Sequence, residues 1–504
     1  MSVPAVLAID QGTTGSTCLV VAEDGRVLSR GYSEFTQHFP RPGWVEHDAL
    51  EIWEVTRRVA REALSGAADA DVRGVGITNQ RETIVLWDRR TLEPVHRAIV
   101  WQDRRTTAVC RELEAAGHAD EVRARSGLVI DPYFSGTKVS WLLREHPELR
   151  ARAEGGDLAF GTIDTWLMAR LTDGRTHATE PTNASRTLFY NLAERGWDDW
   201  LLDLLGVPRA LLPEVRASSG DFGTTSGEHL GAELPLAGVA GDQQSALFGQ
   251  GCWSPGLAKN TYGTGAFLLL HTGGDIVPSR HGLLTTAACD AEGGLAYAFE
   301  GSIFVAGAAI QWLRDGLGLL GAAPESDAMA RAVEDNGGVY FVPAFVGLGA
   351  PHWEPEARGT IVGLTRGTTK EHLARAALES MAYATSEVLA AMEADSGLVT
   401  TELRVDGGAA MNDWLMSFQA DLLNVPVRRP AVVETTALGA AGLAGLATGV
   451  WPSANEFLAA QGEPTRFEPG MDRVARGRLR ADWDRAVRAA VGWARDGGGD
   501  AAGT

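Results

Sequence analysis

A polar turn lies close to the N-terminus, enclosed by two short apolar runs. Residues 10–17 read Asp-Gln-Gly-Thr-Thr-Gly-Ser-Thr, and they follow residues 6–9 and precede residues 18–21, both apolar. Apolar runs of this length, bounded by glycine and aspartate, are typical of strands. Glycine lets the backbone approach a ligand closely, and amide and hydroxyl groups suit phosphate oxygens. Asp10 could hold Mg²⁺ at the strand end. The same pattern also fits an ordinary hairpin.

Two further glycine turns follow apolar runs in the second half of the chain. Residues 258–270 enclose a Gly-Thr-Gly turn, and residues 403–412 read as a strand, a Gly-Gly turn and the start of a helix. Backbone amides at such a helix start favour anions. The likeness of the first two turns suggests two halves built alike. The chain has neither a P-loop nor the Rossmann glycine spacing, so the turns predict a nucleotide held between two domains.

Length and charge limit what the chain can be. The chain has 504 residues, 45% of them hydrophobic, and is too long to fold around a single hydrophobic core. We expect an N-terminal domain over residues 1–250, a C-terminal domain over residues 251–495 and a flexible tail over residues 496–504. A net charge of −20 argues against general binding of nucleic acid or of anionic membranes. Without a signal-peptide pattern or a membrane-length apolar run, we expect a cytoplasmic protein.

Several side chains after predicted strands could carry chemistry. Asp242 could accept the proton of an attacking hydroxyl, although an aspartate here also commonly caps a helix. Arg81 and Glu82 could engage the hydroxyl groups of a polyol, or they could form a surface ion pair. Trp101 and Phe267 could pack against the C–H edge of a small polyol, or they could belong to the core. These residues predict a small hydroxyl-bearing substrate.

Two segments carry a specific resemblance. Residues 79–83 read Asn-Gln-Arg-Glu-Thr, and residues 131–138 read Asp-Pro-Tyr-Phe-Ser-Gly-Thr-Lys. Together with the glycine turns they resemble the glycerol kinases, within the carbohydrate-kinase family that shares the actin–hexokinase fold. The similarity extends from about residue 6 to residue 493. It implies an α/β fold of two ribonuclease-H-like (actin/hexokinase-type) domains with the active site in the cleft between them.

The resemblance also implies an activity and a set of site residues. The activity is ATP-dependent phosphorylation of glycerol to sn-glycerol 3-phosphate, with Asp242 as general base and Mg²⁺ assisting an in-line transfer. Asp10 and Asp242 would hold the metal. Glycerol would contact Arg81, Glu82, Tyr133, Asp242, Gln243, Trp101, Phe267 and Thr13. ATP would contact Thr13, Thr14, Gly15, Thr17, Thr264, Gly307, Gln311, Gly408 and Asn412. We expect a homo-oligomer, either a dimer or a tetramer, with no nucleic-acid partner.

The chain departs from its relatives at a few positions. Thr17 stands where many glycerol kinases have arginine, so one phosphate-facing cation is missing. Residues 231–233 read Gly-Ala-Glu where enteric members bind fructose 1,6-bisphosphate with Gly-Thr-Arg, and Ala475 replaces a glutamate that contacts a phosphotransferase protein. Both changes argue against regulation by fructose 1,6-bisphosphate and by the phosphotransferase protein. The alternatives are a kinase for another polyol or sugar on the same fold, a nucleotide-gated assembly or chaperone protein, and a family member that binds without catalysing.

Overall fold

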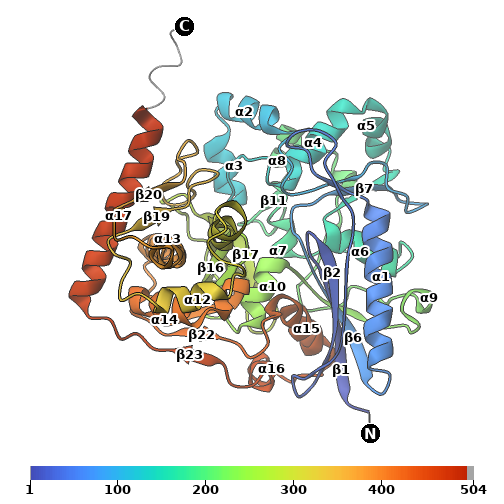
Figure 1. Ribbon diagram of the computed structural model, residues 1–504. Coiled ribbons are helices and arrows are strands. Elements are labelled where there is room, and N and C mark those ends of the chain that lie inside the picture. Colours follow the sequence, from blue (N-terminus) through green and yellow to red (C-terminus); the bar gives the residue numbers. More distant parts are fainter. Residues whose placement is uncertain (1, 497–504) are drawn as a thin grey trace.

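The computed structural model describes residues 2–496 and has two α/β halves, each built on one main sheet (Figure 1). The first sheet has five strands in the order β14-β6-β1-β2-β3, and the second has seven in the order β17-β18-β16-β15-β21-β22-β23. The strands of the first are β14 Leu236–Gly241, β6 Asp71–Asn79, β1 Pro4–Gln11, β2 Gly15–Ala22 and β3 Val27–Glu34. Those of the second are β17 Leu284–Cys289, β18 Leu295–Ile303, β16 Ala266–Gly273, β15 Ala258–Tyr262, β21 Leu403–Gly407, β22 Val427–Arg429 and β23 Thr465–Phe467.

The two sheets share one arrangement. In the first, β1, β2 and β3 form an antiparallel meander, and β6 pairs parallel with β1. In the second, β15, β16 and β18 form the same meander, and β21 pairs parallel with β15. This repeat agrees with the likeness of the two halves expected from the sequence. It also places the glycine turn after β1 and the one after β15 at equivalent ends of their sheets.

Helices cover both faces of the first sheet, which explains why β1 is apolar at consecutive positions. Successive side chains of a strand point to opposite faces. Leu7 therefore belongs to one apolar cluster with Trp53 of α1 (Ala49–Gly66), while Ala8 belongs to another with Leu438 of α15 (Thr435–Thr448). Asp48 caps α1 by accepting the backbone N–H of residue 50 at 2.9 Å. A sheet buried on both faces requires continuous apolar runs rather than alternation.

Helix α15 packs directly on the strand backbones. A Cβ atom added to Gly76 of β6 would lie 2.1 Å from the carbonyl oxygen of Ala440, and one on Gly238 of β14 would lie 2.3 Å from the amide nitrogen of Ala444. Glycine in both strands removes the side chains that would hold the helix away. Although α15 comes late in the chain, it covers the first sheet beside β1, β6 and β14.

A group of short helices forms a cap on the first half, at the top of Figure 1. Its apolar core is shared with the β7–β9 strand pair. These elements are β7 Val85–Asp88, α2 Thr107–Ala115, α3 Ala119–Ser126, α4 Ser135–Glu145, α5 Pro147–Glu154, β9 Leu158–Gly161 and α8 Asp199–Leu205. Smaller elements of this half are β4 Gln37–His38, β5 Glu46–His47, β8 Ala98–Ile99, α6 Ile163–Leu171, β10 Ala178–Thr179, α7 Pro181–Ala184, β11 Tyr190–Asn191, β12 Gly196–Trp197, β13 Glu214–Val215, α9 Gly227–Leu230 and α10 Asp242–Gly249.

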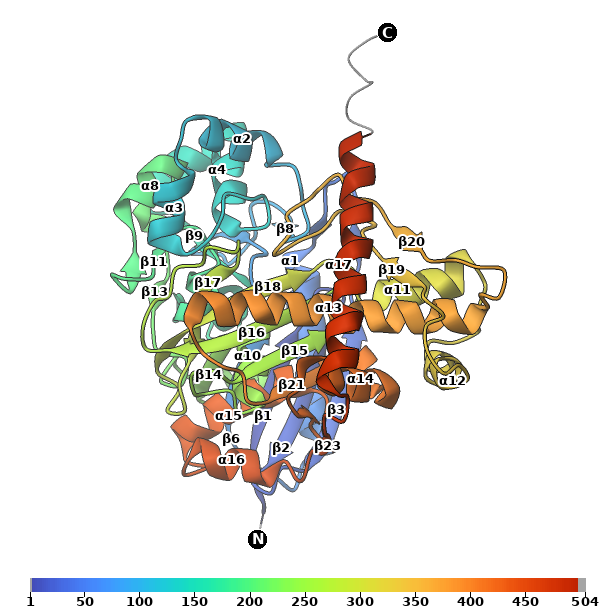
Figure 2. The same ribbon diagram turned by 90° about the vertical axis from the view of Figure 1, so that its left-hand side faces the viewer.

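Two long helices lie on the outside of the second sheet. Figure 2 shows α13 lying along this sheet and α17 crossing α13, and Tyr383 of α13 stacks on Trp483 of α17 with ring centroids 5.0 Å apart. The remaining strands and α-helices are α11 Gly307–Gln311, α12 Glu325–Arg331, β19 Tyr340–Val342, β20 Thr360–Val362, α13 Lys370–Ser396, α14 Asp413–Leu423, α16 Ala454–Ala460 and α17 Arg473–Asp496.

Apart from the last residue of α17, the predicted tail lies outside the described residues. Across residues 2–496, no helix has both the length and the apolar character that crossing a membrane needs.

Replacing Gly76 by valine should destabilise the protein, because its side chain would meet the α15 backbone. We expect the free energy of unfolding to fall by about 1–3 kcal/mol, measured by urea denaturation. The matched control is Gly477→Ala on α17, where an added Cβ meets nothing within 4 Å. That substitution should raise stability by about 0.5–1 kcal/mol. Unchanged unfolding of Gly76→Val would contradict the direct packing of α15.

Candidate active site

Four charged side chains are buried together where the two halves meet. Arg81 donates from Nη1 and Nη2 to the two carboxylate oxygens of Glu300, at 2.5 and 3.1 Å. Arg186 donates from Nη2 to Glu300 at 2.9 Å and from Nε to Glu82 at 2.7 Å. Arg81 Nε lies 3.6 Å from Glu82, which closes the ring. Each of these side chains is at most 2% exposed. We call this group the charge ring.

The charge ring keeps Glu300 and Arg81 ionised. Burial alone would raise the pKa of Glu300, but Arg186 and Arg81 outweigh burial and hold that pKa at about 2. The neighbouring carboxylates likewise keep the pKa of Arg81 well above its usual value despite burial. Two arginines balance two glutamates, so the ring carries no net charge. The alternative that Arg81 and Glu82 form a surface ion pair is wrong, since both side chains are buried.

A chain of contacts extends from the charge ring to the first glycine turn. Arg81 Nε lies 3.1 Å from Oδ1 of Asp242, the first residue of α10, whose side chain is 32% exposed. Arg81 Nη2 also donates to the Tyr133 hydroxyl at 3.3 Å. The Tyr133 ring meets the Trp101 ring edge-on at 5.5 Å, and Trp101 Nε1 donates to Thr13 Oγ1 at 2.9 Å. The structure therefore brings these five predicted site residues together.

Two carboxylates beside this chain of contacts, those of Asp10 and Asp242, are close enough for their charges to interact. Burial and then the Asp242 charge raise the pKa of Asp10, at the end of β1, to about 7. Burial also raises the pKa of Asp242, an effect that Arg81 partly opposes. A divalent cation would relieve this repulsion. Within residues 2–496, no three His, Cys, Asp or Glu side chains cluster as metal ligands. One or two carboxylates plus phosphate oxygens are how proteins commonly hold Mg²⁺, so the pair fits that ion.

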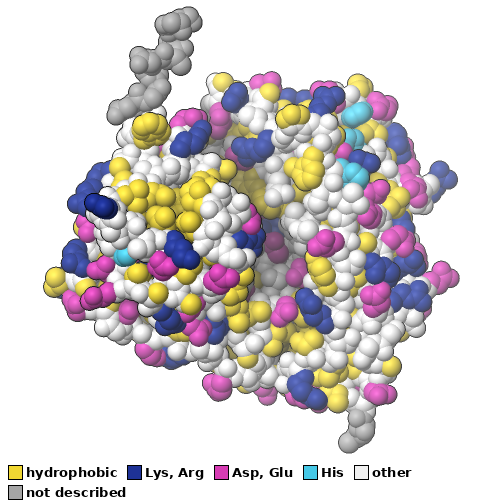
Figure 3. Space-filling view, viewed as in Figure 1, with side chains coloured by type: hydrophobic (Ala, Val, Ile, Leu, Met, Phe, Trp, Pro, Cys, Tyr) yellow, Lys and Arg dark blue, Asp and Glu magenta, His cyan; other side chains and the backbone are white. Residues whose placement is uncertain are grey.

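The second glycine turn meets two other predicted nucleotide contacts. The Gly307 amide donates to the carbonyl of Gly263 at 3.0 Å, and a Cβ on Gly307 would lie 2.6 Å from that oxygen. The carbonyl of Thr264 accepts from the amide of residue 308 at 3.1 Å. Gly408 follows β21, whose last residue pairs with the last residue of β15. Thr264, Gly307 and Gly408 therefore gather at one end of the second sheet. Figure 3 shows the surface hollowed between the two halves.

The remaining predicted nucleotide contacts have varied surroundings. Asn412 caps α14 by accepting the backbone N–H of residue 415 at 2.8 Å, and it donates to Ser326 at 3.3 Å. Gln311 is exposed at the end of α11. In the first half, Thr14 is exposed in the turn, Gly15 begins β2, and Thr17 pairs opposite Asp10. Their contacts with a nucleotide stay predictions.

The other two predicted glycerol contacts lie on α10 or beside it. Gln243 follows it on α10 and is 9% exposed. Phe267 of β16 is half-buried and packs on an apolar cluster that includes Leu247 of α10. Both side chains therefore belong to the surroundings of α10.

Sequence reasoning missed Arg186, Glu300 and Lys259. Glu300 and Lys259 each stand alone as a charge in a largely buried strand, and such a charge requires a partner. That signal was available. Arg186 follows the short helix α7 and shows no periodic pattern that would mark it. Its partners lie 104 and 114 residues away in the chain, so no local spacing reveals them.

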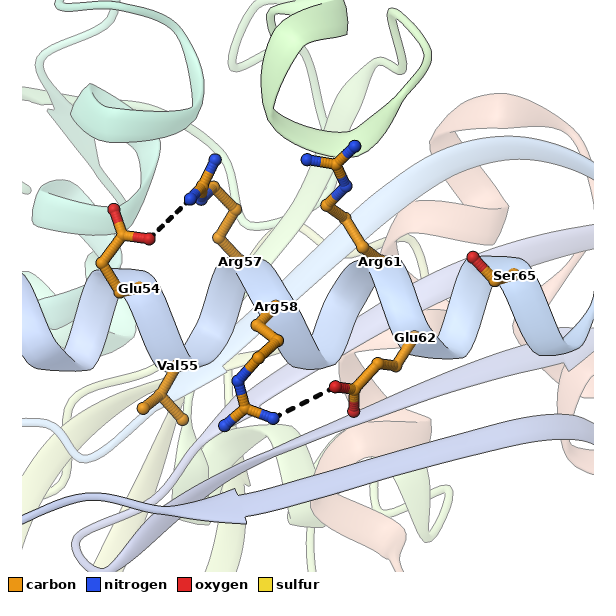
Figure 4. A pocket seen from close by; sticks show the side chains of 7 residues that line it. All are labelled: Glu54, Val55, Arg57, Arg58, Arg61, Glu62 and Ser65. Atoms are coloured by element: carbon orange, nitrogen blue, oxygen red, sulfur yellow. Dashed lines mark hydrogen bonds and ion pairs between the residues drawn. The ribbon is translucent and has the colours of Figure 1, made fainter.

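A second hollow lies on the outer face of α1, with a volume of about 660 Å³. Figure 4 shows two ion pairs along the helix and Arg61 beside them. Arg57 pairs with Glu54 at 2.6 Å, and Arg58 pairs with Glu62 at 3.1 Å. The hollow contains none of the predicted site residues. Four of its charged side chains pair with one another, which leaves them less available to bind a ligand. We therefore place the candidate active site between the two halves.

Family models cover most of the chain. The N-terminal domain model of the FGGY family of carbohydrate kinases matches residues 5–249, and the C-terminal domain model matches residues 258–448. The chain belongs to the FGGY family. The predicted fold class, two actin/hexokinase-type α/β domains, is thereby confirmed.

Relatives within the FGGY family are similar over almost their whole length. The glycerol kinase of Dechloromonas aromatica is 56% identical over 491 residues, covering 97% of this chain and 98% of that protein. The glycerol kinase of Deinococcus radiodurans is 55% identical over 493 residues, covering 97% and 98%. The crystal structure of Plasmodium falciparum glycerol kinase with ADP has a TM-score of 0.92 at 34% identity, covering 97% of this chain and 98% of that one. The resemblance seen in the sequence is therefore confirmed.

Replacing Arg186 by methionine should destabilise the protein strongly, because Glu82 and Glu300 would then share one buried cation. We expect a loss of about 3–5 kcal/mol in the free energy of unfolding, measured by urea denaturation. The matched control is Arg58→Met, which breaks a half-exposed pair and should cost less than about 1 kcal/mol. Equal losses in the two variants would show that the charge ring is no more coupled than a surface pair.

Proposed function

We propose that this FGGY-family protein transfers the terminal phosphoryl group of ATP to glycerol, giving sn-glycerol 3-phosphate. One observation carries the proposal: the charge ring holds Arg81 and Glu82 beside the partly open carboxylate of Asp242. That arrangement places hydrogen-bond donors, an acceptor and a base within one small region. The glycerol kinases of Dechloromonas aromatica and Deinococcus radiodurans support the same substrate.

The polar groups suit a small triol. Hydroxyl groups both donate and accept hydrogen bonds, so a guanidinium and a carboxylate side by side can bind neighbouring hydroxyls. Arg186 occupies one oxygen of Glu82, which leaves the other oxygen to accept from substrate. Trp101 and Phe267 would cover the C–H side of the molecule. A larger sugar would need more polar partners than this group of side chains provides.

Asp242 is the proposed general base. Phosphoryl transfer asks the protein mainly for alignment and charge neutralisation, with one group to accept the hydroxyl proton. Burial raises the pKa of Asp242, which strengthens it as a proton acceptor, and Arg81 keeps the group available in its ionised form. In the proposed step, the carboxylate of Asp242 takes the proton of the attacking glycerol hydroxyl. Closure of the two halves would exclude water, which competes with glycerol for the phosphoryl group.

The nucleotide would lie between the first glycine turn and the two glycine turns of the second half. Thr13, Thr14 and Gly15 would meet the phosphates from the first half, with Thr17 in place of a cation. Thr264, Gly307, Gln311, Gly408 and Asn412 would hold the rest of the nucleotide from the second half. Asp10 and Asp242 would hold Mg²⁺, which neutralises phosphate charge when it is bound. Assembly as a dimer or a tetramer stays a prediction.

An assay of ADP release with four conditions tests the proposed function. Glycerol should give ADP release well above the rate without substrate, while xylulose and erythritol should give little, because the polar groups suit three hydroxyls. Faster turnover with xylulose or erythritol than with glycerol would show that the preferred substrate is larger than glycerol. Equal release in all four conditions would contradict the kinase activity itself.

Asp242→Asn should remove most of the activity while the nucleotide still binds. The amide cannot accept the hydroxyl proton, so kcat should fall by about 10²–10⁴-fold, whereas the Kd for ADP, measured by calorimetry, should change less than about twofold. Asp199→Asn, which breaks an exposed pair with Arg209, is the matched control and should retain wild-type kcat. Near-normal turnover by Asp242→Asn would refute its role as base.

A further inference from the structure

Lys259 is a fully buried cation on β15 for which the proposed reaction has no role. The residue is 0% exposed, and Nζ donates to Oε1 of Gln243 at 2.5 Å and to Oγ1 of Thr261 at 2.7 Å. Lysine is almost never fully buried unless it is paired. Its position next to a predicted substrate contact therefore needs a physical reason.

The ammonium of Lys259 decides which way round the Gln243 carboxamide lies. An ammonium only donates hydrogen bonds, so the amide must turn its oxygen toward Lys259 and its NH₂ group away. Gln243 directly follows Asp242 at the start of α10, beside the candidate glycerol site. With its oxygen turned toward Lys259, this side chain directs its NH₂ donors away from Lys259. A bound hydroxyl can then accept a hydrogen bond from Gln243.

Acidic groups from both halves keep Lys259 charged. Burial lowers the pKa of Lys259 to about 8, while the carboxylates of Asp406, Asp242 and Glu300 oppose that shift. Asp406 itself accepts from Nε2 of Gln250 at 3.1 Å. The ammonium therefore remains protonated and able to donate at neutral pH. Replacing it by a neutral side chain would leave the Gln243 amide free to turn over.

The contact between Lys259 and Gln243 crosses between the halves. Lys259 belongs to the second sheet, whereas Gln243 lies on α10, directly after the last strand of the first sheet. We propose that Lys259 is a positioning residue, which orients the Gln243 carboxamide to donate to a substrate hydroxyl only while the two halves are in contact. This inference rests on the proposed function. It gives the second half a direct part in recognising the substrate.

Lys259→Met should weaken glycerol binding selectively. We expect the KM for glycerol to rise about tenfold, as for the loss of one well-placed hydrogen bond, while the KM for ATP stays within about twofold. Gln243→Ala should raise the KM for glycerol similarly. The double variant should be no worse than Gln243→Ala, because Lys259 acts through Gln243. Additive losses, or an equal rise in both KM values, would overturn the positioning role.

Gln243→Glu tests the inference without removing the buried cation. The carboxylate keeps Lys259 paired, so the unfolding midpoint should equal or exceed that of the wild type, but the donors are gone. The KM for glycerol should again rise about tenfold. A wild-type KM in Gln243→Glu would overturn the inference. Glycerol-dependent turnover by the wild type, measured in the same assay, separates the two proposals: its absence contradicts the proposed function, whereas its presence with a normal Gln243→Glu contradicts only the role of Lys259.

Discussion

The bidentate pair between Arg81 and Glu300 is the contact on which the candidate site depends. An isolated buried charge costs several kcal/mol, so a guanidinium can lie at this depth only if carboxylates surround it. Glu300 occupies both terminal nitrogens of Arg81, and Arg186 then balances the second glutamate of the ring. Each member restricts its neighbours. The side chains that face a substrate are therefore held by their charges as well as by packing, and one of those charges comes from the other half of the molecule.

The charge ring has no net charge, which matters because the whole chain is strongly acidic, with a net charge of −20. The proposed ligand, ATP, is an anion, and the charge ring contributes two positive and two negative groups. In the proposed function, attraction for phosphate would then come from backbone amides in the glycine turns and from the cation that Asp10 and Asp242 would hold. Thr17, which pairs opposite Asp10, is uncharged and adds no cation to this turn.

Local sequence patterns predicted much of the fold and part of the site. The glycine turns after β1 and β15, the cap at Asp48 and the strand ending at Asp242 all follow from short-range chemistry, and the structure contains each of them. The placement of Arg81 beside Asp242 also agrees with expectation. Glu300 could not be matched to its partner, because it lies 219 residues from Arg81 and spacing carries no information over that distance. The burial of Arg81 and Glu82, which excludes a surface pair, likewise depends on tertiary packing.

Helix α15 has a consequence for how the chain is made. The alternate side chains of β1 and β2 that face α15 belong to one apolar cluster with it, although more than 400 residues separate the two segments. During synthesis, the first sheet leaves the ribosome with this face uncovered and must wait for nearly the whole chain to follow. The N-terminal half is therefore an incomplete folding unit by itself. A chain truncated before α15 would expose an apolar, aggregation-prone face of the first sheet.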